Sequence, residues 1–389
     1  MKILHTVEQY YPSVGGMQEV VRQLSERLVK LGHEVTVATA YRADRLSAVQ
    51  AGVRIETFKI SGNAARGYEG AASEIKRYQD FLVESDFDII TNFAAQEWAA
   101  DLALDVLDKI RAKKVFVPTG FSGFYDPLYQ NFFSRLGPLL RRYDLNIFLS
   151  DDYRDINFAR EQGVSKLVVI PNGASAEEFL ERVDCDFRKK MAIPQDYFLV
   201  LSVGSHTGEK GHREAIDIFS RARLEKAALV IIANIYSPLC YWECRIRSFI
   251  YNLFHRNKIL IRSLTRPETV AAYQQADLFL FPSNVECSPL VLFEAMASRL
   301  PFLTTDVGNA KEIIKWGDGG RLLPTDKDDR FYSHARIAES AALLKELRAD
   351  KDLREKLARN GFKAWQERFT WAKISSQYEE NYKKLLGIL

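Results

Sequence analysis

The chain has few cysteines, no long hydrophobic run and almost no net charge. Only 4 of its 389 residues are cysteine, which is typical of free thiols in a reducing compartment rather than of a disulfide framework. No apolar segment reaches the length of about 20 residues that a membrane-spanning helix needs. The 54 lysines and arginines and 51 aspartates and glutamates give a net charge of +3. This argues against a nucleic-acid partner, which would require a dense basic surface.

The beginning of the chain lacks the features of an export signal. The short apolar run 2–7 is followed at once by Glu8 and two tyrosines, whereas a signal peptide carries a longer apolar region. We therefore expect a cytoplasmic protein, whose contact with a membrane, if it has one, is peripheral and on the inner face.

Short apolar runs that alternate with longer amphipathic stretches dominate the sequence. Residues 3–7 and 35–39 are strand-like, and the stretch between them has helical spacing and ends at Gly32. Such β-α-β units predict parallel strands with right-handed crossovers. The rhythm breaks after residue 173 and a new cycle begins near residue 198, so we expect an α/β protein with two Rossmann-like domains, 1–182 and 183–370. Ligands of open α/β sheets lie beyond the carboxyl ends of the strands, so two such sheets that face each other would hold a ligand in the cleft between them.

The most informative segment is 282–297, where a short loop leads from a buried strand into a helix. Ser288 is a suitable N-cap and Pro289 a favoured first helical residue. The backbone amides of Leu290 and Val291 would then be free to bind a diphosphate.

Two glutamates flank this predicted helix N-terminus. Glu294 shares the face of Leu290 and Val291 and is placed to bind hydroxyls such as those of a ribose, while Glu286 lies on the loop, near sugar hydroxyls. The alternative is a solvated loop position for Glu286 and a surface position for Glu294. A glutamate within the largely apolar run 289–297 needs a polar partner, which weakens that alternative.

The segment resembles the two-glutamate motif of retaining glycosyltransferases with the GT-B fold, specifically family 4 (glycosyl transferases group 1). Further segments that carry the likeness, which covers nearly the whole chain, are Gly15-Gly16 with 31–37, 170–173 with Phe179, 301–324, and Phe369-Thr370-Trp371 before Tyr378 and Tyr382. The resemblance implies an acceptor-side domain 1–182 and a donor domain 183–370 facing each other across a cleft, and a helix in 371–389 that crosses back to the first domain.

The resemblance also implies an activity. We expect a metal-independent enzyme that moves a sugar, with retention, from a nucleotide-diphosphate donor (UDP or GDP) to a glycan or lipid-linked acceptor, in bacterial surface polysaccharide or glycolipid synthesis. No cofactor is expected besides the donor substrate. Two alternatives stay open: a nucleotide-sugar epimerase or hydrolase of the same fold, and a non-catalytic binding subunit.

Roles in the first domain follow from this likeness. Gly15 and Gly16 are expected to approach the donor phosphates or sugar, because glycines between a strand and a helix allow close contact with backbone. Thr119 stands at or beside the place of a histidine that contacts the donor sugar in many members, and it cannot act as a cation. Asn172 belongs to the segment between the domains.

In the second domain, Gly204 and Lys210 lie on a loop that is expected to contact the donor phosphates. The Lys210 ammonium would neutralise charge on the leaving diphosphate. Ser205 occupies the place of the family's usual arginine. His206 beside it could substitute in part if protonated, although an exposed loop histidine is the more common case.

Three further expectations concern the base, a metal and a membrane. Arg262 and Leu264 are expected near the nucleobase. Cys240 and Cys244 could share a helix face, but without a histidine or another cysteine pair nearby they make a poor metal site. Basic amphipathic stretches at 128–143 and, less strongly, 241–258 could lie on a membrane surface, although such a stripe is more often the core face of a helix.

Overall fold

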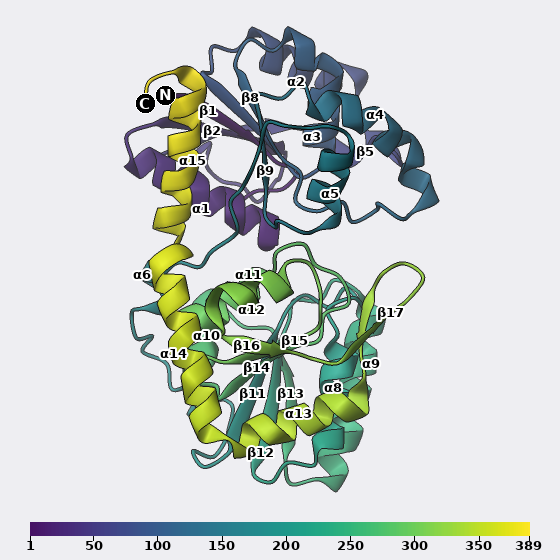
Figure 1. Ribbon diagram of the computed structural model, residues 1–389, viewed down its shortest axis with the longest axis vertical. Helices are drawn as coiled ribbons and strands as arrows, with labels where there is room; N and C mark the ends of the chain where they lie inside the picture. The colour runs from purple at the N-terminus through teal and green to yellow at the C-terminus, as the bar shows by residue number, and fades with distance from the viewer. The chain divides into compact units, whose positions relative to one another are not determined.

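A computed structural model describes residues 1–389 and divides them into two compact units (Figure 1). The first unit comprises Met1–Asn172 and Trp371–Leu389, and the second comprises Gly173–Thr370. The chain therefore leaves the first unit once and returns to it with its last helix, α15 (Trp371–Leu386).

Residues 173–182, expected in the first domain, belong to the second unit. The Trp365 indole donates a hydrogen bond of 3.2 Å to the Ala174 carbonyl, and Phe179 packs edge-on against Tyr273 in the core of that unit. The sequence of the polar stretch after β10 does not reveal these contacts, because Trp365 and Tyr273 lie far along the chain.

The first unit contains an 8-stranded sheet in the order β10-β9-β8-β7-β1-β2-β4-β3, in which only β3 and β4 pair antiparallel. Its strands are β1 (Lys2–Thr6), β2 (Glu34–Ala40), β3 (Val49–Gln50), β4 (Val53–Phe58), β7 (Ile89–Phe93), β8 (Lys113–Val117), β9 (Leu145–Phe148) and β10 (Leu167–Val169), with a separate hairpin of β5 (Ser61–Asn63) and β6 (Gly67–Glu69).

Helices cover both faces of this sheet. They are α1 (Gly16–Lys30), α2 (Ala72–Glu84), α3 (Trp98–Val106), α4 (Gln130–Leu140) and α5 (Arg154–Glu161), with two short 3-10 turns at Leu107–Lys109 and Pro127–Tyr129. On one face, α15 packs beside α1, and the Tyr382 hydroxyl lies 2.7 Å from that of Thr91 on β7. On the other, buried side chains of α2 and α3 pack against β1, β2, β4 and β7.

The second unit is built on a fully parallel sheet in the order β13-β12-β11-β14-β15-β16. The strands are β11 (Phe198–Val203), β12 (Ala227–Ile232), β13 (Lys258–Arg262), β14 (Leu278–Phe281), β15 (Phe302–Thr304) and β16 (Gly320–Leu322); β17 (Thr325–Lys327) and β18 (Ser333–Ala335) form a separate antiparallel pair. Every residue of β12 is buried, as expected for a parallel strand covered on both faces.

Alternate side chains of these strands enter two apolar layers. The helices of the unit are α6 (Ala176–Phe179), α7 (Phe187–Lys190), α8 (His212–Ala222), α9 (Pro238–Phe254), α10 (Arg266–Gln275), α11 (Leu290–Ala297), α12 (Ala310–Gly317), α13 (Ile337–Ala349) and α14 (Lys351–Arg368). Leu199 and Leu201 of β11 face the layer of α10, α11 and α12, and Val200 faces that of α8, α9 and α13. The predicted α/β class with Rossmann-like parallel sheets is confirmed.

Candidate functional site

Two loops of the second unit follow the neighbouring strands β11 and β14, where the strand order reverses. From β11 the chain proceeds to β12 and β13 on one side, and from β14 to β15 and β16 on the other. Open α/β sheets bind ligands in the crevice at such a switch point, beyond the carboxyl ends of the strands. The loops are 204–211 and 282–289, so the structure brings both predicted donor-binding segments to this point.

The two loops are held together by backbone contacts. The Asn284 amide donates a hydrogen bond of 2.8 Å to the Glu209 carbonyl, and the Ser283 hydroxyl oxygen lies 3.2 Å from the same oxygen. Gly211 has φ +65°, and a Cβ there would lie 1.8 Å from the Pro282 carbonyl oxygen. Only glycine fits this left-handed, closely packed position.

Lys210 and Glu286 form an ion pair between the loops. The Lys210 Nζ lies 2.6 Å from the Glu286 Oε1, which also accepts a hydrogen bond of 2.9 Å from the Ser283 hydroxyl. Their side chains are 27% and 13% exposed, respectively. Glu286 is therefore not a solvated loop residue, and the structure places it beside the one cation of loop 204–211.

Helix α11 begins later than expected. Pro289 occupies the N-cap position and Leu290 is the first helical residue, so the prediction of Ser288 as N-cap was wrong. The Ser288 hydroxyl instead accepts a hydrogen bond of 3.1 Å from the Asn309 side chain. The amides of Leu290 and Val291 still lie in the first turn, where a helix offers them no acceptor.

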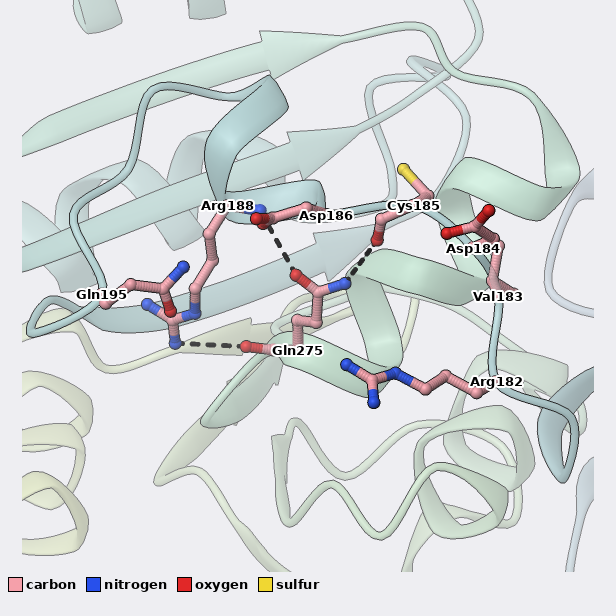
Figure 2. Close-up of a pocket in the computed structure, with 8 residues that line it drawn as sticks. All are labelled: Arg182, Val183, Asp184, Cys185, Asp186, Arg188, Gln195 and Gln275. Atoms are coloured by element: carbon pink, nitrogen blue, oxygen red, sulfur yellow. Dashed lines mark hydrogen bonds between the residues drawn. The ribbon is translucent and has the colours of Figure 1, made fainter.

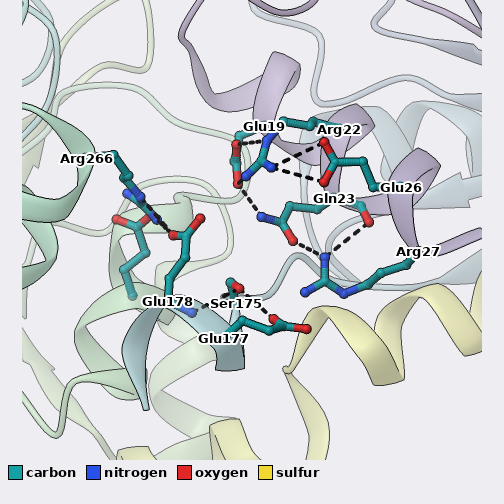
Figure 3. A network of polar contacts seen from close by, with 10 residues as sticks. Glu19, Arg22, Gln23, Glu26, Arg27, Ser175, Glu177, Glu178 and Arg266 are labelled. Atoms are coloured by element: carbon teal, nitrogen blue, oxygen red, sulfur yellow. Dashed lines mark hydrogen bonds and ion pairs between the residues drawn. The ribbon is translucent and has the colours of Figure 1, made fainter. Parts of the chain in front are cut away.

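Glu294 is 6% exposed and has the polar partner that its apolar surroundings require. Its Oε1 lies 2.7 Å from a guanidinium nitrogen of Arg266. The same nitrogen lies 2.6 Å from a carboxylate oxygen of Glu178 (Figure 3). A surface position for Glu294 is therefore excluded. Its role toward a ribose stays a prediction.

His206 is not on the surface. It is 0% exposed, and burial lowers the pKa of its imidazole, so the ring is neutral at pH 7. Its Nδ1 lies 3.5 Å from the Cys240 Sγ. His206 consequently cannot replace the arginine missing at Ser205, and the expectation of an exposed loop histidine was wrong.

Arg262 and Leu264 lie at and just after the carboxyl end of β13, an edge strand. Strand β12 separates β13 from β11, so these residues are not at the switch point itself. Both are partly buried, and Arg262 donates a hydrogen bond of 2.9 Å to the Ile261 carbonyl. Contact with a base stays a prediction.

The first unit has its own switch point, between β1 and β7. Gly15 and Gly16 follow β1, and a Cβ on Gly16 would meet no atom within 4 Å. Packing inside the protein therefore does not require glycine at Gly16. On the same unit, Glu19 of α1 bonds to Arg22 at 2.8 Å and begins a polar ladder along the helix (Figure 3).

Thr119 follows β8 with φ +61°, a left-handed conformation that is strained for a β-branched residue. The next amide, of Gly120, donates a hydrogen bond of 2.8 Å to the buried carboxyl group of Asp155. Asn172 is 4% exposed and ends the first part of the unit. The strained conformation of Thr119, next to an amide that bonds to the buried Asp155, is consistent with a functional position.

Two carboxyl groups of the first unit went unnoticed in the sequence. Glu97 follows β7 and accepts a hydrogen bond of 3.4 Å from the Glu8 amide, which follows β1. Burial, reinforced by the charge of Glu8, raises the pKa of Glu97 to about 8. Burial raises the pKa of Asp101 to about 7. The sequence places Glu97 shortly after a strand, where ligands of such sheets bind. No motif around it distinguishes it from other acidic residues in loops.

A pocket of about 610 Å³ lies elsewhere in the second unit (Figure 2). Its polar groups bond to one another: Gln275 accepts a hydrogen bond of 3.3 Å from the Arg188 amide and donates one of 2.7 Å to the Cys185 carbonyl. Arg188 also lies 2.8 Å from Asp277, which does not line the pocket. Asp277 directly precedes β14, which places these contacts at the amino ends of the strands. This is opposite to the edge at which such sheets bind ligands.

The stripe expected to contact a membrane at 128–143 is buried. Phe132, Phe133, Leu136 and Leu140 of α4 pack in the core of the first unit. The apolar face of α4 is therefore unavailable to lipid, and of the two possibilities for this stripe the structure supports the core face. No helix of the structure combines the length and hydropathy needed to cross a bilayer.

Two Rossmann-like units, each with its polar loops at a strand-order reversal, define the GT-B class of glycosyltransferases. The family model described as "Glycosyltransferase Family 4" matches residues 14–178, and that described as "Glycosyl transferases group 1" matches residues 184–364. The chain belongs to this family, the GT-B glycosyltransferases of group 1 and family 4.

Individual relatives are distant. An uncharacterized glycosyltransferase of Methanocaldococcus jannaschii is 26% identical over 224 residues, 56% of this chain and 54% of that protein. The N-acetyl-alpha-D-glucosaminyl L-malate synthase of Bacillus anthracis is 22% identical over 97% of this chain and 96% of its own length. The crystal structure of Anabaena HepE in complex with UDP-glucose superposes with a TM-score of 0.77 at 17% identity, covering 99% of this chain and 100% of that one.

Proposed function

We propose that this glycosyltransferase takes its sugar from a nucleotide-diphosphate donor bound at the β11/β14 switch point of the second unit. The acceptor is a glycan or a lipid-linked sugar, the transfer proceeds with retention, and the product belongs to a bacterial-type surface polysaccharide or glycolipid. The observation that carries the proposal is the ion pair of 2.6 Å between Lys210 and Glu286, held between two loops that bond to each other.

Lys210 is the expected counter-charge for the diphosphate. An ammonium has three N–H donors, so Lys210 can keep its bond to Glu286 and donate to a phosphate oxygen at the same time. The amides of Leu290 and Val291 at the start of α11 add donors that need no reorganisation. With Ser205 and a neutral His206 in place of an arginine, Lys210 is the one cation of this loop, and it is shared between Glu286 and the leaving group.

The two glutamates are expected to bind hydroxyl groups. Glu286 is neutralised by Lys210, so it does not repel an incoming diphosphate and can accept a hydrogen bond from a sugar hydroxyl. Glu294 has a second carboxylate oxygen besides the one at 2.7 Å from Arg266, and a carboxylate can accept several hydrogen bonds. A ribose hydroxyl is the ligand that suits this oxygen.

The first unit has candidate ligand contacts at the carboxyl ends of its own strands. Gly16 borders open space, which lets a ligand approach its backbone. Thr119 can bond to a sugar hydroxyl. Glu97, with a pKa of about 8, is protonated at neutral pH and can donate as well as accept.

A thermal-shift screen against UDP-, GDP- and ADP-sugars identifies the donor, because a ligand that binds only the folded state raises its melting temperature. The fold shared with a UDP-glucose complex makes uridine donors the first to test. Proton NMR of the product then gives its anomeric configuration, and inversion would contradict the proposed retention.

The alternatives predict different outcomes of the same assay. Donor loss that does not depend on acceptor would favour an epimerase or hydrolase. If K210A and E286A both sustain the cellular function, the protein acts as a binding subunit and catalysis at this site is refuted.

A further inference from the structure

A histidine and two cysteines meet beneath the loop that carries Lys210. The ligand atoms of His206, Cys240 and Cys244 all lie within 4.8 Å of one another. His206 and Cys244 are 0% exposed, and Cys240 is 8% exposed. The histidine comes from the loop after β11, whereas both cysteines lie one turn apart on the buried face of α9.

The spacing suits a tetrahedral metal ion. Zinc binds sulfur at about 2.3 Å and imidazole nitrogen at about 2.0 Å, which sets the S···N edge of a tetrahedron at about 3.5 Å. The His206 Nδ1 lies 3.5 Å from the Cys240 Sγ. The Cys244 Sγ lies within 4.8 Å of both other ligand atoms.

Backbone hydrogen bonds hold the candidate ligands in place in the absence of an ion. The His206 amide donates a hydrogen bond of 2.8 Å to the Asn234 carbonyl, and the Ser237 amide donates one of 2.6 Å to the His206 carbonyl. These bonds tie the loop after β11 to the turn that starts α9. The three ligand-bearing positions are therefore preorganised relative to one another.

Nearby polar atoms lack partners. The Nε2 of His206 and both ring nitrogens of His212 are buried without a hydrogen bond, and the two rings are 4.6 Å apart. Buried polar groups without partners are rare in folded proteins. With the His206 Nδ1 on the ion, a His212 nitrogen in the fourth position would give one of these atoms a partner.

We propose that His206, Cys240 and Cys244 bind one Zn²⁺ ion, with His212 or a water molecule in the fourth position. Binding forms two zinc–sulfur bonds and releases the two thiol protons to solvent. The ion would be structural: it would fix loop 204–211, in which Lys210 lies four residues after His206. The sequence argument against a metal at Cys240 and Cys244 was that no histidine lies near them in the chain. The structure brings His206 beside Cys240, although it lies 34 residues earlier.

The test measures bound zinc in the full-length protein, purified without added metal and after treatment with a chelator and reloading. We expect about one zinc per chain in the wild type and in the control C185S, whose thiol lies in another part of the unit. H206N and C244S should lose the zinc and melt at a lower temperature. Substituting Co²⁺ in the wild type should give a thiolate charge-transfer band, which does not depend on the folding of any variant.

Two results would overturn the proposal. One is a reloaded wild type without stoichiometric zinc and without the cobalt band. The other is a Cys240–Cys244 disulfide in protein purified under reducing conditions. Neither measurement uses a donor or acceptor, so its outcome is independent of the proposed transferase activity.

A second feature of α9 supports a separate inference. Its outward face carries a stripe of apolar side chains that are between 51% and 84% exposed: Leu239, Trp242, Ile246, Phe249, Ile250, Leu253 and Phe254. At 100° per residue, this stripe lies on the side of the helix opposite Cys240 and Cys244. So many large apolar groups on one face are unusual for a surface that meets only water.

The charges around the stripe favour one occupant. Arg245 lies at its edge and is exposed, and Arg256 and Lys258 follow the end of the helix, also exposed. The acidic Glu243 is neutralised by Arg213 and Arg247, at 3.2 Å each. Two copies of this face would bring like charges together, whereas anionic lipid complements them. We infer that α9 docks the protein on an anionic bilayer.

Sedimentation of full-length protein with vesicles tests this docking. We expect binding to phosphatidylcholine vesicles that contain phosphatidylglycerol, and at least tenfold weaker binding to pure phosphatidylcholine. F249Q/L253Q should lose binding with an unchanged melting temperature, because both side chains are exposed. F331Q, an exposed apolar position on another segment, should bind like the wild type.

Vesicle binding that survives F249Q/L253Q would refute the inference. So would a dimer, seen by light scattering, that this double substitution dissociates while wild-type protein does not sediment with vesicles.

Discussion

Replacing Lys210 by methionine tests the candidate site most directly, because it removes the ammonium and keeps most of the aliphatic stem. The Lys210–Glu286 pair is partly exposed, 27% and 13%, so its loss should cost about 1 kcal/mol of folding stability or less. Glu286 keeps its hydrogen bond of 2.9 Å from Ser283. Fold and melting temperature should therefore change little.

The effect on catalysis should be much larger. An ammonium about 4 Å from a developing negative charge contributes about 4 kcal/mol at an effective dielectric constant of about 20. Removing one such preorganised group typically lowers kcat by about 100- to 1000-fold. No second cation in loop 204–211 can compensate, since Ser205 is neutral and burial lowers the pKa of His206.

The assay compares kcat for sugar transfer at saturating donor, with melting temperature as a check on folding. K190M is the matched control, because Lys190 also pairs with a glutamate in the second unit, Glu268, and lies away from the switch point. It should retain wild-type kcat. K210M activity within about threefold of wild type would refute the assignment of Lys210 to the leaving diphosphate.

Three further predictions concern stability. G211A should lower the free energy of unfolding by about 3 kcal/mol, measured by urea denaturation, because its Cβ would meet the Pro282 carbonyl at 1.8 Å in a left-handed conformation; an unchanged midpoint would contradict this close packing. R266Q should cost about 2 kcal/mol, a value reduced for the partial exposure of the arginine, since it leaves the buried Glu294 carboxylate without its partner; R266K should recover part of the loss. Glu97 has its pKa raised from 4.5 to about 8, so the folded state holds a proton that the unfolded state releases, and this contribution to stability is lost as pH rises from about 4.5 to 8. E97Q should flatten that part of the curve of melting temperature against pH, and an unaltered slope would refute the burial of this carboxyl group.

Local patterns in the sequence were enough to predict the class of fold. Strands such as β14 are continuous apolar runs. A short apolar run of this kind indicates a buried strand from local sequence alone. Strand β4, with the sequence Val-Arg-Ile-Glu-Thr-Phe, lacks such a run because polar residues interrupt it. The start of α11 was misplaced because Ser288 bonds to Asn309, 21 residues later, instead of capping the helix.

The sequence by itself determined the α/β class, the two sets of parallel strands and the segments that carry Lys210, Glu286 and Glu294, since each depends on residues close together in the chain. Tertiary structure alone decided which side chains meet. Lys210 contacts Glu286, 76 residues away. His206 lies beside Cys240 because the paired strands β11 and β12, which precede them, end at the same edge of the sheet. Periodicity likewise showed that both α4 and α9 have apolar faces, but only packing against neighbouring elements determined that the face of α4 is buried and that of α9 exposed.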